Sequence, residues 1–260
     1  YLNSPQTPIF CKSELLFGLA ETHHALTAGA RPVIVEGPLD AIAINTASPH
    51  HAALAPCGTT LTTAQFEAIH QVADLDTTGV LLALDADAAG RNAAVRYWEV
   101  LAQVKGPLGA VLLPEGLDPA DLMRYQGCMA VRESLQSAPR LVDLVIDARM
   151  HQSGGPMEFT EQRWAAVRAA ATVIGGLPPE QIGRQVARVA RALDLEPGLV
   201  TNAVMTSVSP DTPSPFDVAA ENFPLAIGEA MRMTAQRPDE QASPRTPRNP
   251  VTERNRRPSR

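Results

Sequence analysis

Short apolar runs alternate with amphipathic stretches through the first half of the chain. The runs are nearly free of polar residues, except that the first and third end on a carboxylate, and such runs are typical of strands buried on both faces of a sheet. They occupy residues 32–36, 53–55, 80–85 and 109–113. Each leads into a helical pattern, and these patterns cover residues 39–47, 63–73, 88–103 and 119–126. Alternating strands and helices predict an α/β fold with a parallel sheet flanked by helices.

The pattern changes after this region. Residues 129–208 hold amphipathic stretches with helical period, separated by Gly and Pro, and predict a small helical bundle. Pro, Ser, Thr and Arg dominate the remainder, which predicts a disordered C-terminal tail. Ahead of the first strand, the sequence predicts a loop and then a helix with Ser13 at its N-cap. We therefore expect four parts, at 1–31, 32–128, 129–208 and 209–260.

Composition and charge limit the classes of function. The 260-residue chain is 45% apolar, with no apolar run long enough for a membrane span and no signal peptide. Its three cysteines share no C-x-x-C spacing, which argues against zinc and fits a reducing cytoplasm. The net charge of −6 means that, in a nucleic-acid complex, much of the phosphate charge would be neutralised by a metal ion, by a few local bases or by residues outside this sequence.

Three carboxylates stand at the carboxyl ends of predicted strands. Glu36 ends the first strand, Asp85 ends the third, and Asp87 follows two residues later. If these strands are neighbours, the side chains crowd one edge of the sheet, where α/β folds bind ligands. Crowded carboxylates need a counter-charge, and all-oxygen ligands favour Mg²⁺ or Mn²⁺ over zinc. Such ions promote chemistry at phosphates by orienting them and neutralising developing charge.

Neighbouring residues fit the same site. Asp40 lies in the first turn of the next predicted helix. Gly37 and Gly90 each follow a carboxylate closely and permit a tight backbone approach or an unusual turn. Arg91 stands at the start of a helix, where it could meet a phosphate or hold a carboxylate.

The carboxylates also have simpler interpretations. Asp118 and Asp121 follow the fourth strand and open a helix, so they either bind a second metal ion or cap that helix. Taken singly, the aspartates at 85 and 87 could be helix caps too, and Glu36 could be a salt-bridge partner. The combined set at strand ends favours the metal, and no histidine is expected to be a ligand.

The spacing of these residues resembles a known signature. Glu-Gly-x-x-Asp after one strand and Asp-x-Asp after a later one resemble the Toprim domain, which bacterial primases, type IA and II topoisomerases and some nucleases share. Four stretches are similar to the catalytic core of the bacterial replicative DNA primase: YLNSPQTPIFCKSELLFGL (1–19), APCGTTLT (55–62), DADAAGRNAA (85–94) and LLPEGLDPADL (112–122). The resemblance continues more weakly through the helical segments.

This resemblance implies a fold, the Toprim-type sheet, and a biochemical function. The function is metal-dependent synthesis of short RNA primers on single-stranded DNA from ribonucleoside triphosphates. The replicative helicase is a candidate partner. It implies Mg²⁺ or Mn²⁺ as cofactor, held by Glu36, Asp85 and Asp87 and supported by Asp40. Lys12 and Arg91 match residues that would contact the template or nucleotide phosphates.

The sequence also departs from the family's pattern. Asp118 is a candidate for a further metal ion, but the family usually has Asp where this chain has Ala120, with Asp121 one place later. A full primase has an N-terminal zinc-binding domain and a basic subdomain, whereas this sequence starts at Tyr1. We therefore expect a truncated primase or a primase-like protein of a mobile element.

Two alternatives belong to different classes of function. One is another Toprim enzyme, a nuclease or a topoisomerase-like protein, and a topoisomerase would need a tyrosine nucleophile among Tyr1, Tyr97 and Tyr125. The other is a non-catalytic module that binds DNA or a replication partner. Metal-dependent nicking of DNA would favour the first, and binding that does not need Glu36 would favour the second.

Overall fold

The computed structural model describes residues 11, 13–56, 61–84, 88–114, 116–153 and 160–208. All of these residues lie within one compact unit, Tyr1–Thr212. The predictions for the tail and for Lys12, Asp85 and Asp87 fall on residues outside the described set. No helix in the described part of the chain is long and apolar enough to cross a membrane.

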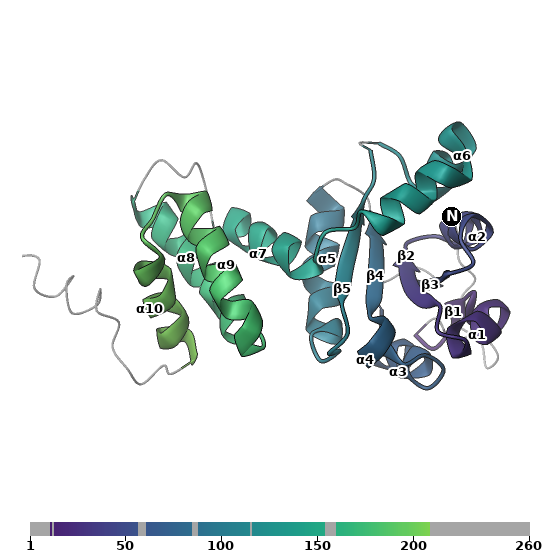
Figure 1. Ribbon diagram of the computed structural model, residues 1–260, viewed down its shortest axis with the longest axis horizontal. Coiled ribbons are helices and arrows are strands. Elements are labelled where there is room, and N and C mark those ends of the chain that lie inside the picture. The colour runs from purple at the N-terminus through teal and green to yellow at the C-terminus, as the bar shows by residue number, and fades with distance from the viewer. Residues whose placement is uncertain are drawn as a thin grey trace, which may run out of the picture. The chain divides into compact units, whose positions relative to one another are not determined.

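A mixed five-stranded sheet forms the centre of the fold (Figure 1). In spatial order its strands are β1 (Leu16–Phe17), β3 (His51–Pro56), β2 (Arg31–Val35), β4 (Val80–Leu84) and β5 (Leu108–Leu112). The four longer strands are parallel, and β1 pairs with β3 in the antiparallel direction. The predicted α/β fold is confirmed, with a short antiparallel edge strand that the apolar pattern did not indicate.

The segment before β2 differs from its prediction. Ser13 lies in a turn and not at a helix N-cap, because β1 comes next and α1 (Leu19–Thr27) begins only after it. Gly18 allows the change of direction, since its φ is +91° and a Cβ there would lie 2.7 Å from the Ala53 carbonyl oxygen. The Ser13 carbonyl accepts a hydrogen bond from the Thr62 hydroxyl at 2.6 Å. Pairing with a distant strand thus overrides the local helical pattern.

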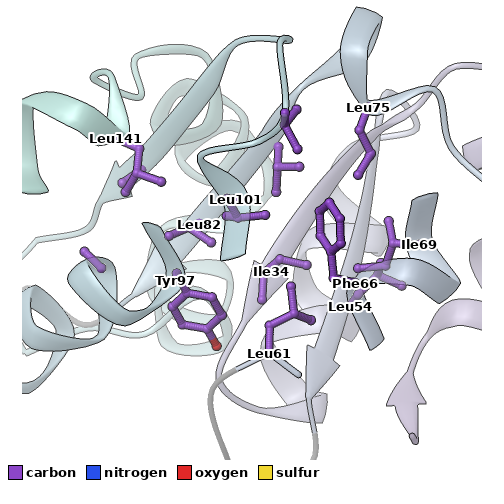
Figure 2. Close-up of a cluster of buried hydrophobic side chains, with 14 of the residues drawn as sticks. Ile34, Leu54, Leu61, Phe66, Ile69, Leu75, Leu82, Tyr97, Leu101 and Leu141 are labelled. Atoms are coloured by element: carbon purple, nitrogen blue, oxygen red, sulfur yellow. The ribbon is translucent and has the colours of Figure 1, made fainter. Parts of the chain in front are cut away.

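Helices cover both faces of the sheet. They are α2 (Pro38–Ala47), α3 (Thr63–His70), α4 (Leu75–Thr78), α5 (Ala88–Leu101) and α6 (Pro119–Gln136). Alternate strand residues point to opposite faces, so Ile34 and Leu82 pack with α3 and α5 (Figure 2). Val33 and Leu81 pack on the other face with α2 and α6. The sheet is therefore buried between two apolar layers.

A helical segment follows the sheet. Its helices are α7 (Leu141–Gln152), α8 (Thr160–Gly175), α9 (Pro179–Leu193) and α10 (Pro197–Val208), and they enclose an apolar cluster of their own. Asp143 on α7 accepts hydrogen bonds from Arg184 at 2.9 Å and from the fully buried Gln185 at 2.6 Å, both on α9. These contacts are consistent with the helical bundle that the amphipathic pattern predicts.

Gly79 directly precedes β4, and its substitution tests how strongly the fold depends on the conformation of this residue. Its backbone (φ +67°, ψ −164°) lies in a region that only glycine adopts readily, and a Cβ there would lie 1.9 Å from the Pro107 carbonyl oxygen. Gly79→Ala should lower the free energy of unfolding by about 2–4 kcal/mol, measured by urea denaturation. Gly198→Ala is the control, because no atom lies within 4 Å of its Cβ position. Equal stability of the two variants would contradict this role.

Candidate functional site

The candidate site lies at the carboxyl edge of the parallel strands. β2 and β4 are neighbours, with Val35 paired to Ala83, so the condition set for the predicted metal site holds. Glu36 directly follows β2, and its side chain is exposed. β4 ends at Leu84, immediately before residues 85–87, which lie outside the described residues.

Asp40 is a buried carboxylate in this region, with 8% of its surface exposed. Its Oδ2 accepts a hydrogen bond from the Gly37 N–H at 3.1 Å, and its Oδ1 accepts one from the Ala120 N–H at 3.3 Å. Gly37 has ordinary extended backbone, and a Cβ there would lie 3.0 Å from Asp40 Oδ2. The glycine thus leaves room for the carboxylate, and the carboxylate joins the start of α2 to the start of α6.

Asp118 occupies the N-cap of α6. Its Oδ1 accepts a hydrogen bond from the Asp121 N–H at 2.6 Å. Asp121 lies in the first helical turn, where a negative charge interacts favourably with the helix dipole. Capping is therefore the role that the described contacts support, and metal binding by either residue stays a prediction.

Gly90 and Arg91 lie near the start of α5, which begins directly after residues 85–87. Gly90 is buried within the helix, and Arg91 is exposed. An exposed guanidinium close to the carboxyl edge is suited to bidentate contact with phosphate.

Tyr97 is a candidate that sequence reasoning considered only as a nucleophile. The ring extends from α5 into the core and is 4% exposed (Figure 2). Burial, and then the negative charge of Glu36, raise the pKa of its hydroxyl to about 12, while Arg96 and a hydrogen bond with the Leu61 backbone act in the opposite direction. The influence of Glu36 indicates that the phenol lies near the candidate site. The apolar pattern could only indicate that position 97 faces the core.

Other features of the described residues lie apart from this edge. No three His, Cys, Asp or Glu side chains among them gather into a metal-binding group, and two of the three predicted ligands are outside that set. A cavity of about 620 Å³ is lined by residues that include Trp98, Lys105, Pro107 and Arg140. Because residues 105–107 precede β5, this cavity borders the amino edge of the strands and is not part of the candidate site.

Comparison with known proteins shows which proteins this chain is related to. Residues 33–123 match the Toprim-like family. The DNA primase of Synechococcus elongatus is 32% identical over 182 residues, which cover 68% of this chain and 26% of that protein. The crystal structure of the RNA polymerase domain of Mycobacterium tuberculosis primase DnaG has a TM-score of 0.62 and 26% identity, covering 74% of this chain and 60% of that one. A DnaG primase catalytic domain bound to single-stranded DNA has a TM-score of 0.58 and 26% identity, covering 75% and 60%.

The chain is a homologue of the RNA polymerase domain of bacterial DNA primases. The resemblance predicted from the sequence motifs is thus confirmed. The chain spans about a quarter of the length of the curated primase it matches and about 60% of the solved polymerase domain. It is a primase-like Toprim protein.

The interaction between Tyr97 and Glu36 predicts a pH dependence. The pKa of Tyr97 is about 12 in the folded chain against an ordinary value of 10.0, so folding favours the protonated phenol. This contribution to stability is complete below about pH 10 and is lost as the pH rises to about 12. Tyr97→Phe should make stability less dependent on pH in this window, as measured by urea denaturation.

The same interaction predicts the effect of removing the charge at position 36. Glu36→Gln should lower the pKa of Tyr97, although burial keeps it above 10.0, the ordinary value. Ultraviolet absorbance of tyrosinate measures the change, and Glu67→Gln on α3 serves as the control with the same substitution. An unchanged Tyr97 titration in Glu36→Gln would show that the two groups are not neighbours.

Proposed function

We propose that this chain is the nucleotidyltransferase part of a primase, which synthesises short RNA primers on single-stranded DNA from ribonucleoside triphosphates. The observation that carries the proposal is the pairing of β2 with β4, since it puts Glu36 at the edge from which residues 85–87 leave β4. Homology with primase polymerase domains, one of them bound to single-stranded DNA, supports the class of substrate.

Glu36, Asp85 and Asp87 are the proposed ligands of Mg²⁺ or Mn²⁺. Glu36 fits this role because its carboxylate is exposed directly after a buried strand. The donor set is oxygen only, which suits hard divalent cations, and Toprim domains typically bind Mg²⁺. When bound, the ion would orient the triphosphate and neutralise the charge that develops as a 3′-hydroxyl attacks the α-phosphorus and pyrophosphate leaves.

Cationic side chains are proposed to hold the substrate phosphates. Arg91 is exposed close to the start of α5, and its guanidinium offers paired donors to a phosphate. Lys12 is proposed to make the same kind of contact with the template or the nucleotide. Both contacts depend on charge, so their contribution should weaken as salt concentration rises.

Asp118 is a further candidate metal ligand, but one of its oxygens already caps α6. Its Oδ1 accepts the Asp121 N–H, but a carboxylate has several lone pairs and the second oxygen can still bind a cation. A metal role there would add to capping and would not replace it.

A topoisomerase-like reaction has less support. Its chemistry needs a tyrosine hydroxyl that DNA can reach, and Tyr97 is 4% exposed within the core. Tyr125 is exposed on α6, but no carboxylate or histidine is among its described contacts, where Arg124 lies over its ring at 5.4 Å. Primer synthesis requires no protein nucleophile and fits the carboxylate edge better.

Primer synthesis by the whole chain tests the proposal. The chain, incubated with single-stranded DNA, labelled ribonucleotides and Mg²⁺ or Mn²⁺, should make short RNA. Groups that only support metal ligands usually contribute about 10–100-fold to metal affinity or activity, so Glu36→Gln should reduce product by about 100-fold or more. Glu67→Gln makes the same change on the exposed surface of α3 and should leave activity unaltered.

Two results would contradict the proposal in different ways. Equal synthesis by the parent chain and Glu36→Gln would mean that the metal site is elsewhere. No synthesis by the parent, together with Mn²⁺ binding that depends on Glu36, would retain the metal site and would point to another Toprim reaction or to a binding role.

A further inference from the structure

We propose that Asp40 is a positioning residue that caps two helices at once and thereby holds the Glu36 turn against the start of α6. The inference rests on the proposed function, because it assigns Asp40 a role in assembling that metal site. The structural part of the inference stands on two hydrogen bonds and on the packing around them.

The first hydrogen bond lies within α2. Gly37 is the N-cap of the helix and Asp40 is its third residue, so the bond from the Gly37 N–H to Asp40 Oδ2 is the side-chain half of a capping box. This bond fixes the peptide that directly follows Glu36. The direction in which the chain leaves β2 is therefore set by the Asp40 carboxylate.

The second hydrogen bond crosses to a different helix. The Ala120 N–H is one of the first N–H groups of α6, which have no partner inside that helix, and it donates to Asp40 Oδ1. Asp118 accepts the neighbouring Asp121 N–H. Two carboxylates thus cap α6, one from its own N-cap and one from α2, although Asp40 and Ala120 are 80 residues apart in the sequence.

Packing reinforces this link, although Gly127 (φ +81°) interrupts α6 beyond its first turns. The buried faces of α2 and α6 share one apolar cluster, in which Ala41 and Ile44 accompany Leu122. At the far end of α2, the Arg132 Nε of α6 donates to the Ala47 carbonyl oxygen. Arg132 lies beyond the interruption at Gly127, so the start of α6 is held by the packing of Leu122 and by the Asp40 carboxylate. Because the same carboxylate accepts the Gly37 N–H, a shift of the α6 start would be transmitted to the peptide after Glu36.

The geometry favours positioning over metal ligation. Each Asp40 oxygen accepts an N–H at a helix N-terminus, where the helix dipole stabilises a negative charge. Asp40 is also buried, with 8% of the residue exposed, whereas Glu36 is exposed. Asp40 therefore acts on the candidate metal through the peptides of Gly37 and Ala120.

Asp40→Asn tests this role with little change of shape. Asparagine offers one carbonyl oxygen, so one of the two N–H groups would face an NH₂ group and lose its acceptor. We expect the affinity for Mn²⁺, measured by electron paramagnetic resonance, to fall by about 10–100-fold, as for other residues that orient metal ligands. Amide hydrogen exchange at Gly37 or Ala120 should become faster. Asp74→Asn, at the exposed N-cap of α4, is the matched control and should leave Mn²⁺ affinity unchanged, because asparagine caps as well as aspartate.

Gly37→Ala provides a second test that alters no charge. Its Cβ would lie 3.0 Å from Asp40 Oδ2, and the backbone conformation suits alanine, so the substitution pushes on the carboxylate without straining the chain. We expect a smaller loss of Mn²⁺ affinity in the same direction. Thermal unfolding of both variants confirms that they are folded when binding is measured.

The outcomes separate the inference from the proposed function. Parent-like Mn²⁺ affinity in Asp40→Asn would overturn the positioning role. A loss as large as that of Glu36→Gln, with Gly37→Ala unchanged, would make Asp40 a ligand and would also overturn it. A parent chain that binds Mn²⁺ but makes no primers contradicts the proposed function, and Mn²⁺ affinity still decides the role of Asp40. A parent that binds no Mn²⁺ overturns both.

Discussion

β2 and β4 lie side by side in the sheet, and the parallel register between them determines what can gather at the carboxyl edge. The pairing of Val35 with Ala83 makes both strands end within a residue of each other. Glu36 follows β2 there, and β4 ends at Leu84, the last described residue before Asp85. Both strands are buried on each face, so a slip in register would draw a polar residue at a strand end, such as Glu36, into the apolar layers at a high cost in free energy. The hydrophobic core thus sets the position of the polar edge.

A second constraint joins two helices that pack on the same face of the sheet. α2 and α6 start from different strands, yet Asp40 ties their first turns together. Asp118 is the N-cap of α6, next to the peptide that Asp40 binds. The candidate metal ligand Asp118 and the capping residue Asp40 therefore lie close together. Such an arrangement gives a metal site support from packed helices, which hold ligands more accurately than loops do.

Much of this organisation was predictable because burial leaves a simple pattern. Continuous apolar runs gave the four parallel strands, and the carboxylate after the first run marked the edge correctly. The short strand β1 was missed, since two residues carry no period and their pairing with β3 depends on a distant segment. The N-cap role of Ser13 was wrong for the same reason, because the helix begins beyond Gly18.

The candidate site was predictable only in part. Residue types and strand ends indicated Glu36, and local spacing indicated that Asp118 could cap a helix. The bond between Asp40 and Ala120 joins residues that are 80 positions apart, and no local pattern contains such information. The sequence pointed to Tyr97 only as a possible nucleophile, and its electrostatic interaction with Glu36 follows from the packing of α5 against the sheet.

The most direct test of the metal site is a crystal structure of the chain grown with Mn²⁺, in which anomalous scattering locates the ion. The account predicts a manganese peak bonded to Glu36 and to at least one carboxylate of Asp85 and Asp87, with Asp40 outside the coordination shell. A peak that is absent from this edge, or that has Asp40 as a ligand in place of Glu36, would contradict it.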